Sequence, residues 1–311
     1  MYGSSIICIS IVLSATMKIV DGSMFSYSES SSSSSPNHDD DNDTHADQCG
    51  GLRWIDLSVA QHDGTPILNQ SCGFIQKGHV CGVIGPSGSG KSTLLAALGG
   101  TTLRSTKLQV SGHVWYDHEN SEERSHLSTS EGDVALLQQE DVFFSMLTPY
   151  ETLDLAAKLQ LPCHVRDEER ESIVNQLMDS LGLSRVKHRR VGDRKVGGEG
   201  GGGLSGGEMR RLSVAIELIT TPKLLLADEP TTGLDSSQAA KVMTLISKVS
   251  KKKMIPTICT LHQPRTSIWQ MLDSFILLAP GGKVCYVGMQ NDAHHYFSKI
   301  GYKCPSETNP A

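Results

Sequence analysis

Four short, mainly apolar runs stand out along the chain, at residues 79–84, 134–137, 223–227 and 254–261. Runs of this length and composition are typical of strands that are buried on both faces of a parallel sheet. Each run leads into a loop that carries polar or glycine residues. Because ligands of doubly wound sheets bind at the carboxyl ends of the strands, we expect these loops to form the functional site.

Other segments alternate between apolar and polar positions, as half-buried strands do. They are residues 52–59, 66–75 and 108–116. These segments predict an antiparallel β subdomain near the N-terminus, with residues 52–59 as an edge strand. The polar stretch between Asp117 and Asp133 is interpreted as an exposed loop. Residues 275–278 and 284–287 flank Pro280-Gly281-Gly282, which predicts a hairpin.

The middle of the chain is predicted to be helical, which gives a helical subdomain of about residues 142–220. Thr148 and Glu151 match a capping box with Pro149 at the first helical position, so we expect a helix through Leu159. Apolar residues at helical spacing predict a second helix, which Gly182 ends. These residues are Ile173, Val174, Leu177, Met178 and Leu181.

Composition places the chain among ordinary globular proteins. Of its 311 residues 38% are hydrophobic and 20% are charged, so a core is available. The net charge of −6 argues against a nucleic-acid partner. Eight cysteines without a C-x-x-C pair are interpreted as reduced thiols rather than as a disulfide framework or a zinc site.

The first 50 residues are predicted to be a disordered tail rich in serine and aspartate. Within it, residues 5–17 weakly resemble a signal peptide, but no Lys or Arg precedes their apolar core. A start at Met17 or Met24, or a plain disordered tail, are the alternatives. No window of the sequence approaches the roughly 18–20 apolar residues of a membrane-spanning helix.

Residues 85–92 fit the phosphate-loop pattern G-x-x-x-x-G-K-[ST] between a predicted strand and a predicted helix at 93–98. The glycines let backbone N–H groups surround phosphate oxygens, the lysine neutralises their charge, and the last serine supplies a hydroxyl to Mg²⁺. The candidate nucleotide-binding residues are Gly85, Pro86, Ser87, Gly88, Ser89, Gly90, Lys91, Ser92 and Thr93.

Two later motifs complete this picture. A buried strand at residues 224–227 leads to Asp228, which is expected to join the Mg²⁺ shell, and to Glu229 beside it. Earlier in the chain, Ser205 can cap the start of a helix. The glycines at this helix start leave backbone N–H groups open to an anion. This second motif consists of Leu204, Ser205, Gly206, Gly207 and Glu208.

Together these motifs resemble the ATP-binding cassette (ABC) ATPases. The resemblance implies an α/β fold with a P-loop NTPase core, in which ATP and Mg²⁺ are bound and ATP is hydrolysed. It implies that Glu229 is the general base that orients the attacking water. The signature at residues 204–208 would act in trans, on an ATP held by a second cassette, so the expected partner is another cassette in a homo- or heterodimer.

The resemblance also suggests roles for three residues in other loops. His262, at the end of a predicted strand, resembles the switch histidine that contacts the γ-phosphate. Gln139 resembles the glutamine that touches Mg²⁺ and relays the nucleotide state, and its neighbour Gln138 is a competing assignment. The expected Mg²⁺ shell is thus Ser92, Gln139 and Asp228. Asp235 resembles the D-loop aspartate of the dimer interface, with a helix N-cap as the alternative.

The chain departs from the family pattern at two places. Trp54 is expected to point into the core rather than to stack on adenine, and the position expected for a stacking residue falls near Gln61 or His62. Residues 197–203 are glycine except for Glu199. This run either slows the ordering of the composite site or is a harmless surface expansion.

Further motifs resemble the G subfamily of white-like transporters. They are Val191-Gly192-Asp193, Ala215-Ile216-Glu217-Leu218, Leu261-His262-Gln263-Pro264, Gly281 to Gly288, His295-Tyr296-Phe297, Gly301-Tyr302, Cys304-Pro305 and Asn309-Pro310-Ala311. In that subfamily the cassette precedes the membrane helices, so a transmembrane domain is expected after Ala311. The sequence is then a fragment, a truncated gene model or a cassette that works with separate membrane subunits.

The function expected from the resemblance is ATP hydrolysis that drives substrate translocation, with the cassette on the cytoplasmic face of a membrane. The alternatives are a soluble ABC ATPase without a transport role and a nucleotide-binding partner subunit with low turnover.

Overall fold

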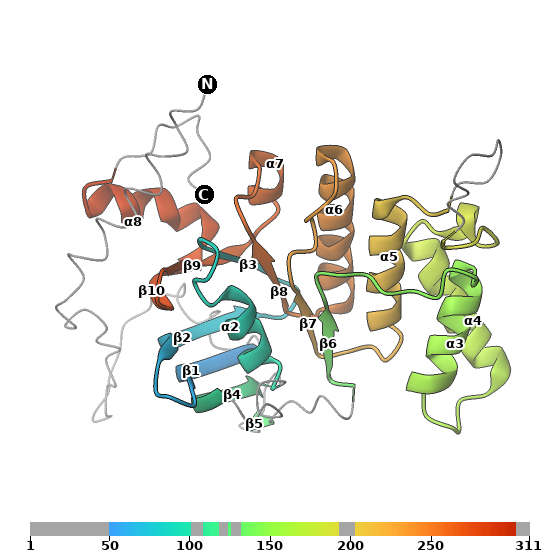
Figure 1. Cartoon of the computed structure of the whole chain (residues 1–311), viewed down its shortest axis with the longest axis horizontal. Coiled ribbons are helices and arrows are strands. Elements are labelled where there is room, and N and C mark those ends of the chain that lie inside the picture. Colours follow the sequence, from blue (N-terminus) through green and yellow to red (C-terminus); the bar gives the residue numbers. More distant parts are fainter. Residues whose placement is uncertain (1–49, 101–107, 118–123, 126–131, 193–202, 303–311) are drawn as a thin grey trace, which may run out of the picture.

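A mixed sheet organises the residues that the computed structural model describes, which are 50–100, 108–117, 124–125, 132–192 and 203–302. Within these residues ten strands form the sheet, in the order β5-β4-β1-β2-β10-β9-β3-β8-β7-β6 (Figure 1). Strand β10 joins the antiparallel strands β5, β4, β1 and β2 to the rest of the sheet, because it pairs with β2 in parallel and with β9 in antiparallel. This arrangement confirms the predicted α/β class with a P-loop core and an antiparallel N-terminal subdomain.

The parallel part consists of β3 (Val80–Ile84), β8 (Thr257–Leu261), β7 (Leu224–Ala227) and β6 (Val134–Leu137), as the four apolar runs predicted. Alternate residues of β7 enter two different hydrophobic clusters, Leu225 on one face and Leu226 on the other. Burial on both faces explains why these strands are apolar along their whole length.

Three of these strands begin later than predicted, β3 and β7 by one residue and β8 by three. β8 begins at Thr257 rather than at Met254, because Met254 ends the preceding helix in a left-handed conformation, with φ of 54°. The predicted hairpin is confirmed: β9 (Ser274–Ala279) pairs with β3 in parallel and with β10 (Lys283–Met289) in antiparallel.

The antiparallel part is formed by β1 (Gly51–Gln61), β2 (Pro66–Gln76), β4 (Leu108–Asp117) and β5 (Arg124–Ser125). The prediction of an edge strand at residues 52–59 is wrong, because β1 lies between β2 and β4 and pairs with both. Apolar alternation reports which face of a strand is buried and carries no information about its edges. Trp54 is in the core as expected, and its Nε1 donates to Ser71 Oγ at 2.9 Å.

The helices pack on both faces of the sheet. α2 (Lys91–Leu98) lies over β1 and β8, whereas α5 (Gly206–Glu217) and α6 (Ser236–Lys253) pack against each other on the opposite face (Figure 1). α3 (Pro149–Gln160) and α4 (Asp167–Ser180) pack together beyond α5. The remaining helices are α7 (Thr266–Trp269), α8 (Ala293–Lys299) and the 3-10 turns η3 (Ser184–Val186) and η4 (Gln290–Asp292).

Both predicted helices of the middle region are present. Thr148 caps α3 with the reciprocal Glu151 contact, and Pro149 is its first residue. α4 ends at Ser180, just before Gly182, whose φ of 65° favours glycine. The limits of the helical subdomain, about residues 142–220, remain a prediction.

Several expectations lie outside the described residues. They concern the N-terminal tail before residue 50, the glycine run up to residue 202 and residues 303–311. Most of the polar stretch 117–133 also lies there, although β5 falls inside it, where only a loop was expected. In the part of the chain that is described, no helix is long and apolar enough to cross a membrane.

A buried carboxyl group links α5 to the sheet and gives the fold a testable pH dependence. Leu136 N donates to Glu217 Oε2 at 3.0 Å, and burial raises the pKa of Glu217 despite this hydrogen bond. Because the folded-state pKa lies above the ordinary value of 4.5, the stability that this group contributes is complete below that pH and is lost as the pH rises through the folded-state pKa.

We therefore expect Glu217→Gln to stabilise the chain at neutral pH, since the amide keeps an acceptor for Leu136 and carries no buried charge. The gain should shrink as the pH falls toward 4.5. Urea unfolding of both proteins across this pH range measures it, and a gain independent of pH would contradict the prediction.

Candidate functional site

The loop between β3 and α2 brings backbone groups close together. Gly90 precedes α2 with φ of 89°, a conformation that favours glycine, and Gly88 has φ of 76°. A Cβ atom at Gly85 would lie 2.5 Å from the carbonyl oxygen of Leu278. The loop therefore needs its glycines, and it places backbone N–H groups at the start of a helix, where an anion is favoured. α2 begins at Lys91, two residues earlier than predicted.

Two polar groups of this loop suit a phosphate. Lys91 is buried, and its Nζ donates to the carbonyl oxygens of Gly85 and Pro86, each at 3.0 Å. Burial lowers the pKa of Lys91, while the carboxylates of Glu229 and Asp228 raise it. Ser89 Oγ is buried and has no hydrogen-bond partner within the described part of the chain. An ammonium group and an unsatisfied hydroxyl next to a helix start fit a bound phosphate chain.

The residues expected to hold Mg²⁺ lie next to this loop. Ser92 Oγ donates to Asp228 Oδ1 at 3.1 Å, across the edge of the sheet from α2 to the end of β7. Both are hard oxygen ligands, and Mg²⁺ is usually bound by one or two protein oxygens together with water and substrate phosphates. The described residues contain no group of three His, Cys, Asp or Glu side chains that would form an all-protein cage.

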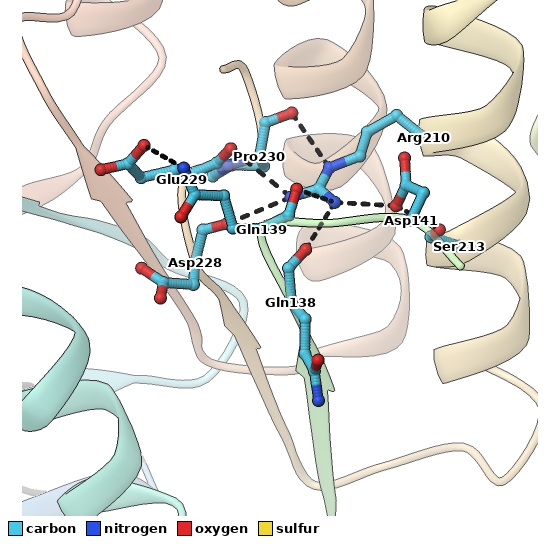
Figure 2. A network of polar contacts seen from close by, with 8 residues as sticks. All are labelled: Gln138, Gln139, Asp141, Arg210, Ser213, Asp228, Glu229 and Pro230. Atoms are coloured by element: carbon cyan, nitrogen blue, oxygen red, sulfur yellow. Dashed lines mark hydrogen bonds and ion pairs between the residues drawn. The ribbon is translucent and has the colours of Figure 1, made fainter. Parts of the chain in front are cut away.

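Glu229 is held by Gln139 from a neighbouring loop and by Thr232 of its own turn. Its Oε2 accepts hydrogen bonds from Gln139 Nε2 at 3.2 Å and from Thr232 Oγ1 at 2.8 Å. Its φ of 45° is uncommon for a residue with a side chain, and such strain occurs often at functional sites. The side chain of Gln138 points away from Glu229 (Figure 2), so the placement favours Gln139 over Gln138.

Thr260 is a site residue that sequence reasoning missed. Its hydroxyl donates to Asp228 Oδ1 at 2.6 Å and accepts the Glu229 backbone N–H at 2.7 Å. The side chain is fully buried on β8. The only signal in the sequence was a hydroxyl in a mainly apolar strand, where a polar group needs a partner.

The loop after β8 reaches the phosphate loop through His262. His262 Nε2 and Ser87 Oγ are hydrogen-bonded at 3.3 Å, although 175 positions separate them in the sequence. The structure thus brings together residues 85–92, Gln139, Asp228, Glu229 and His262, which follow four parallel strands.

The second motif lies apart from this group. Ser205 caps α5 and forms a capping box with Glu208, whose reciprocal half the sequence reasoning overlooked. Leu204 and Gly207 are buried, whereas Ser205 and Gly206 are exposed. Among the described residues, no hydrogen bond or ion pair joins residues 204–208 to residues 85–92. This separation is what a signature that acts in trans requires.

Asp235 is the N-cap of α6. Its Oδ1 accepts the backbone N–H groups of Ser237 and Gln238, each at 2.9 Å. The alternative role of Asp235 as a helix N-cap is therefore confirmed, and its role at a dimer interface remains a prediction.

Comparison with known protein families adds a decisive observation. The model of the ABC transporter family matches residues 68–232, more than half of the chain, and this stretch includes both the phosphate loop and Glu229. The chain belongs to the ABC transporter family. It is an ABC transporter ATPase domain, as the motifs predicted. A second model, of ABC-2 type transporters, matches residues 262–311.

Several of the similar curated proteins are named as members of the ABC transporter G family. ABC transporter G family member 7 of Arabidopsis thaliana is 37% identical over 265 residues, which cover 84% of this chain and 35% of that protein. Protein white of Drosophila melanogaster is 35% identical over 245 residues, covering 79% of this chain and 34% of that protein. The resemblance to white-like transporters is thus confirmed. This chain spans about a third of the length of these two relatives.

The placement of Thr260 gives a second test. We expect Thr260→Val, which keeps the shape of the side chain and removes its hydroxyl, to lower the turnover of ATP by about 10–100-fold, the usual effect of losing a group that orients a metal ligand. Thr260→Ser keeps the hydroxyl and should retain most of the activity. Steady-state ATPase assays compare the two, and equal turnover of both variants would contradict the role of the hydroxyl.

Proposed function

We propose that this chain binds and hydrolyses Mg²⁺-ATP as the cassette of a G-type ABC transporter and couples hydrolysis to substrate translocation. One observation carries the proposal: the phosphate loop, the Asp228–Glu229 turn and Gln139 meet at one edge of the sheet. The family membership and the name of the Arabidopsis thaliana relative support the link to transport.

In this proposal each side chain has one task. The loop N–H groups and Lys91 bind the phosphates, and Ser92, Asp228 and Gln139 hold Mg²⁺. When bound, Mg²⁺ supplies charge neutralisation at the phosphate oxygens that react. Glu229, which already accepts hydrogen bonds from Gln139 and Thr232, orients a water for attack and accepts its proton. His262, beside Ser87, contacts the terminal phosphate from the opposite loop.

A second cassette completes the site. The exposed Ser205 and Gly206 are free to meet a phosphate held by a partner, and they begin a helix whose N-terminus favours an anion. Asp235 lies at the start of α6, where Gly207 of the same chain also packs, so both would lie near the surface between the cassettes. We propose a head-to-tail dimer with two such composite sites.

A membrane domain is the other proposed partner. Directly after Gln139, three apolar side chains are exposed: Val142 is 87% exposed, Phe144 is 70% exposed and Met146 is 68% exposed. Exposed apolar residues gathered in one segment mark interaction sites. Their position next to Gln139, together with the ABC-2 match at residues 262–311, supports docking of a membrane domain there, with the cassette on the cytoplasmic face.

The catalytic role of Glu229 is tested by Glu229→Gln. We expect ATP affinity to be retained, because the phosphate loop is unchanged, and turnover to fall about 10²–10⁴-fold, the usual contribution of a general base. ATP-bound dimers should persist longer in size-exclusion chromatography. Glu140→Gln, which removes an exposed carboxylate nearby, is the control. Near-normal turnover of Glu229→Gln would refute the role.

The composite site is tested by mixing two inactive variants. Lys91→Ala removes the phosphate contact and Ser205→Arg blocks the signature, so neither variant alone should turn over ATP. In a mixed dimer one site combines the intact loop of one copy with the intact signature of the other. We expect the mixture to recover up to roughly a quarter of wild-type turnover, as random pairing in a symmetric dimer gives. No recovery would contradict a homodimeric composite site.

A further inference from the structure

Arg210 is a buried cation that sequence reasoning did not assign. It lies on α5, one turn after Gly207, and only 3% of its surface is exposed. Positions 207, 210 and 214 share the buried face of this helix, where apolar or small residues are the rule. A charge at such a position is costly unless it is fully paired, so its partners indicate what it does.

Its guanidinium group contacts two loops of the site at once (Figure 2). Nε donates to the carbonyl oxygen of Pro230 at 3.2 Å, and Nη2 donates to the carbonyl oxygens of Asp228 at 3.1 Å and Glu229 at 3.4 Å. Nη1 donates on the other side, to the carbonyl oxygens of Gln138 at 2.5 Å and Gln139 at 3.5 Å.

One carboxylate balances the charge. Nη1 also donates to Asp141 Oδ1 at 2.9 Å, and the same oxygen accepts a hydrogen bond from Ser213 Oγ, one turn further along α5. The five N–H donors of a guanidinium group are therefore all used, in a planar fork whose two sides face different loops. Lysine has three donors on a flexible stem and cannot form this set of contacts.

The position of these contacts matters for catalysis. The Arg210 acceptors on one side are the peptide groups of the turn that carries Asp228 and Glu229, and Glu229 has a strained φ of 45°. Such a conformation persists only where the surroundings determine it strongly. The acceptors on the other side belong to the loop that presents Gln139, whose side chain is hydrogen-bonded to Glu229.

We propose that Arg210 is a positioning residue for ATP hydrolysis, which fixes the Gln139 loop against the Asp228–Glu229 turn and joins both to the helix that begins with the signature. Arg210 touches no reacting atom and acts through the backbone of these two segments. Movement of α5 is thereby coupled to the orientation of the general base in the same cassette. This inference rests on the proposed ATPase function.

Kinetics distinguish positioning from a merely structural role. In the 311-residue chain, Arg210→Met keeps the length of the side chain and removes all donors. We expect kcat to fall by about 100-fold, which is the loss that a displacement on the order of 1 Å causes. The Kd for ATP should change less than about threefold, because the phosphate loop does not contact Arg210. Arg210→Lys should be intermediate.

Arg211→Met is the matched control. Arg211 is the next residue of α5 and is half-buried, and no hydrogen bond or ion pair is recorded for it among the described residues. Its variant should keep wild-type kcat and Kd. Unchanged kcat in Arg210→Met, or an equal loss in Arg211→Met, would overturn the inference.

A double-mutant cycle tests the route of the effect. If Arg210 acts by orienting Glu229, then Arg210→Met should add little to the loss already caused by Glu229→Gln. Fully additive losses would show that Arg210 acts elsewhere, and would overturn the inference.

Hydrogen exchange gives a readout that does not need turnover. Amides of residues 138–141 and 228–232 should exchange faster in Arg210→Met than in the wild type, whereas the amides of β8 should keep the wild-type rate. In the Arg211→Met control all of these amides should exchange as in the wild type. The inference would be overturned if residues 138–141 and 228–232 exchanged at the same rate in Arg210→Met as in the wild type. If Arg210→Met does not fold, Arg210→Lys carries the same measurements. A wild-type chain without ATPase activity would defeat the proposed function alone, since the exchange measurement still decides the role of Arg210.

Discussion

The parallel register of β3, β8, β7 and β6 is the constraint on which the site depends. It brings the carboxyl ends of four strands to one edge of the sheet, so that loops from distant parts of the sequence become neighbours. The phosphate loop follows β3, Gln139 follows β6, the two carboxylates follow β7 and His262 follows β8. Hydrophobic clusters on both faces of these strands hold the register, because a strand buried on both sides cannot shift without exposing apolar residues.

Within this frame Asp228 and Glu229 are oriented by their neighbours rather than by their own strand. Thr260 connects the Asp228 carboxylate with the backbone of Glu229, and Gln139 and Thr232 hold the Glu229 side chain. Because Thr260 reaches these residues from β8 and Gln139 from the loop after β6, the geometry of the two carboxylates depends on neighbouring strands of the sheet. Fixed orientation of this kind lets a site stabilise charge without reorganising during the reaction.

Most features encoded in contiguous residues could be predicted from the sequence, although the reciprocal half of the α5 capping box was overlooked. Side-chain contacts between distant residues could not be predicted. The phosphate loop, the capping box of α3 and the central strands each rest on local patterns, and all were found. Thr260 and Arg210 were missed because their partners lie 18 or more positions away. The edge position given to residues 52–59 was wrong because pairing at an edge depends on β4, which follows about fifty residues later. Gln139 was preferred to Gln138 from the sequence because the acidic pair Glu140-Asp141 follows it, and its hydrogen bond to Glu229 supports this choice.

The acceptors of Arg210 have an evolutionary consequence. All but one of them are main-chain carbonyl oxygens, which every residue type supplies equally. Side chains in the two loops can therefore be exchanged during the divergence of related cassettes without removing an acceptor. The type of side chain matters at position 210, where a planar group with five donors is required, and at its counter-ion Asp141. As far as this network is concerned, tolerance to mutation should thus be wide at the positions that offer main-chain acceptors and narrow at Arg210 and Asp141.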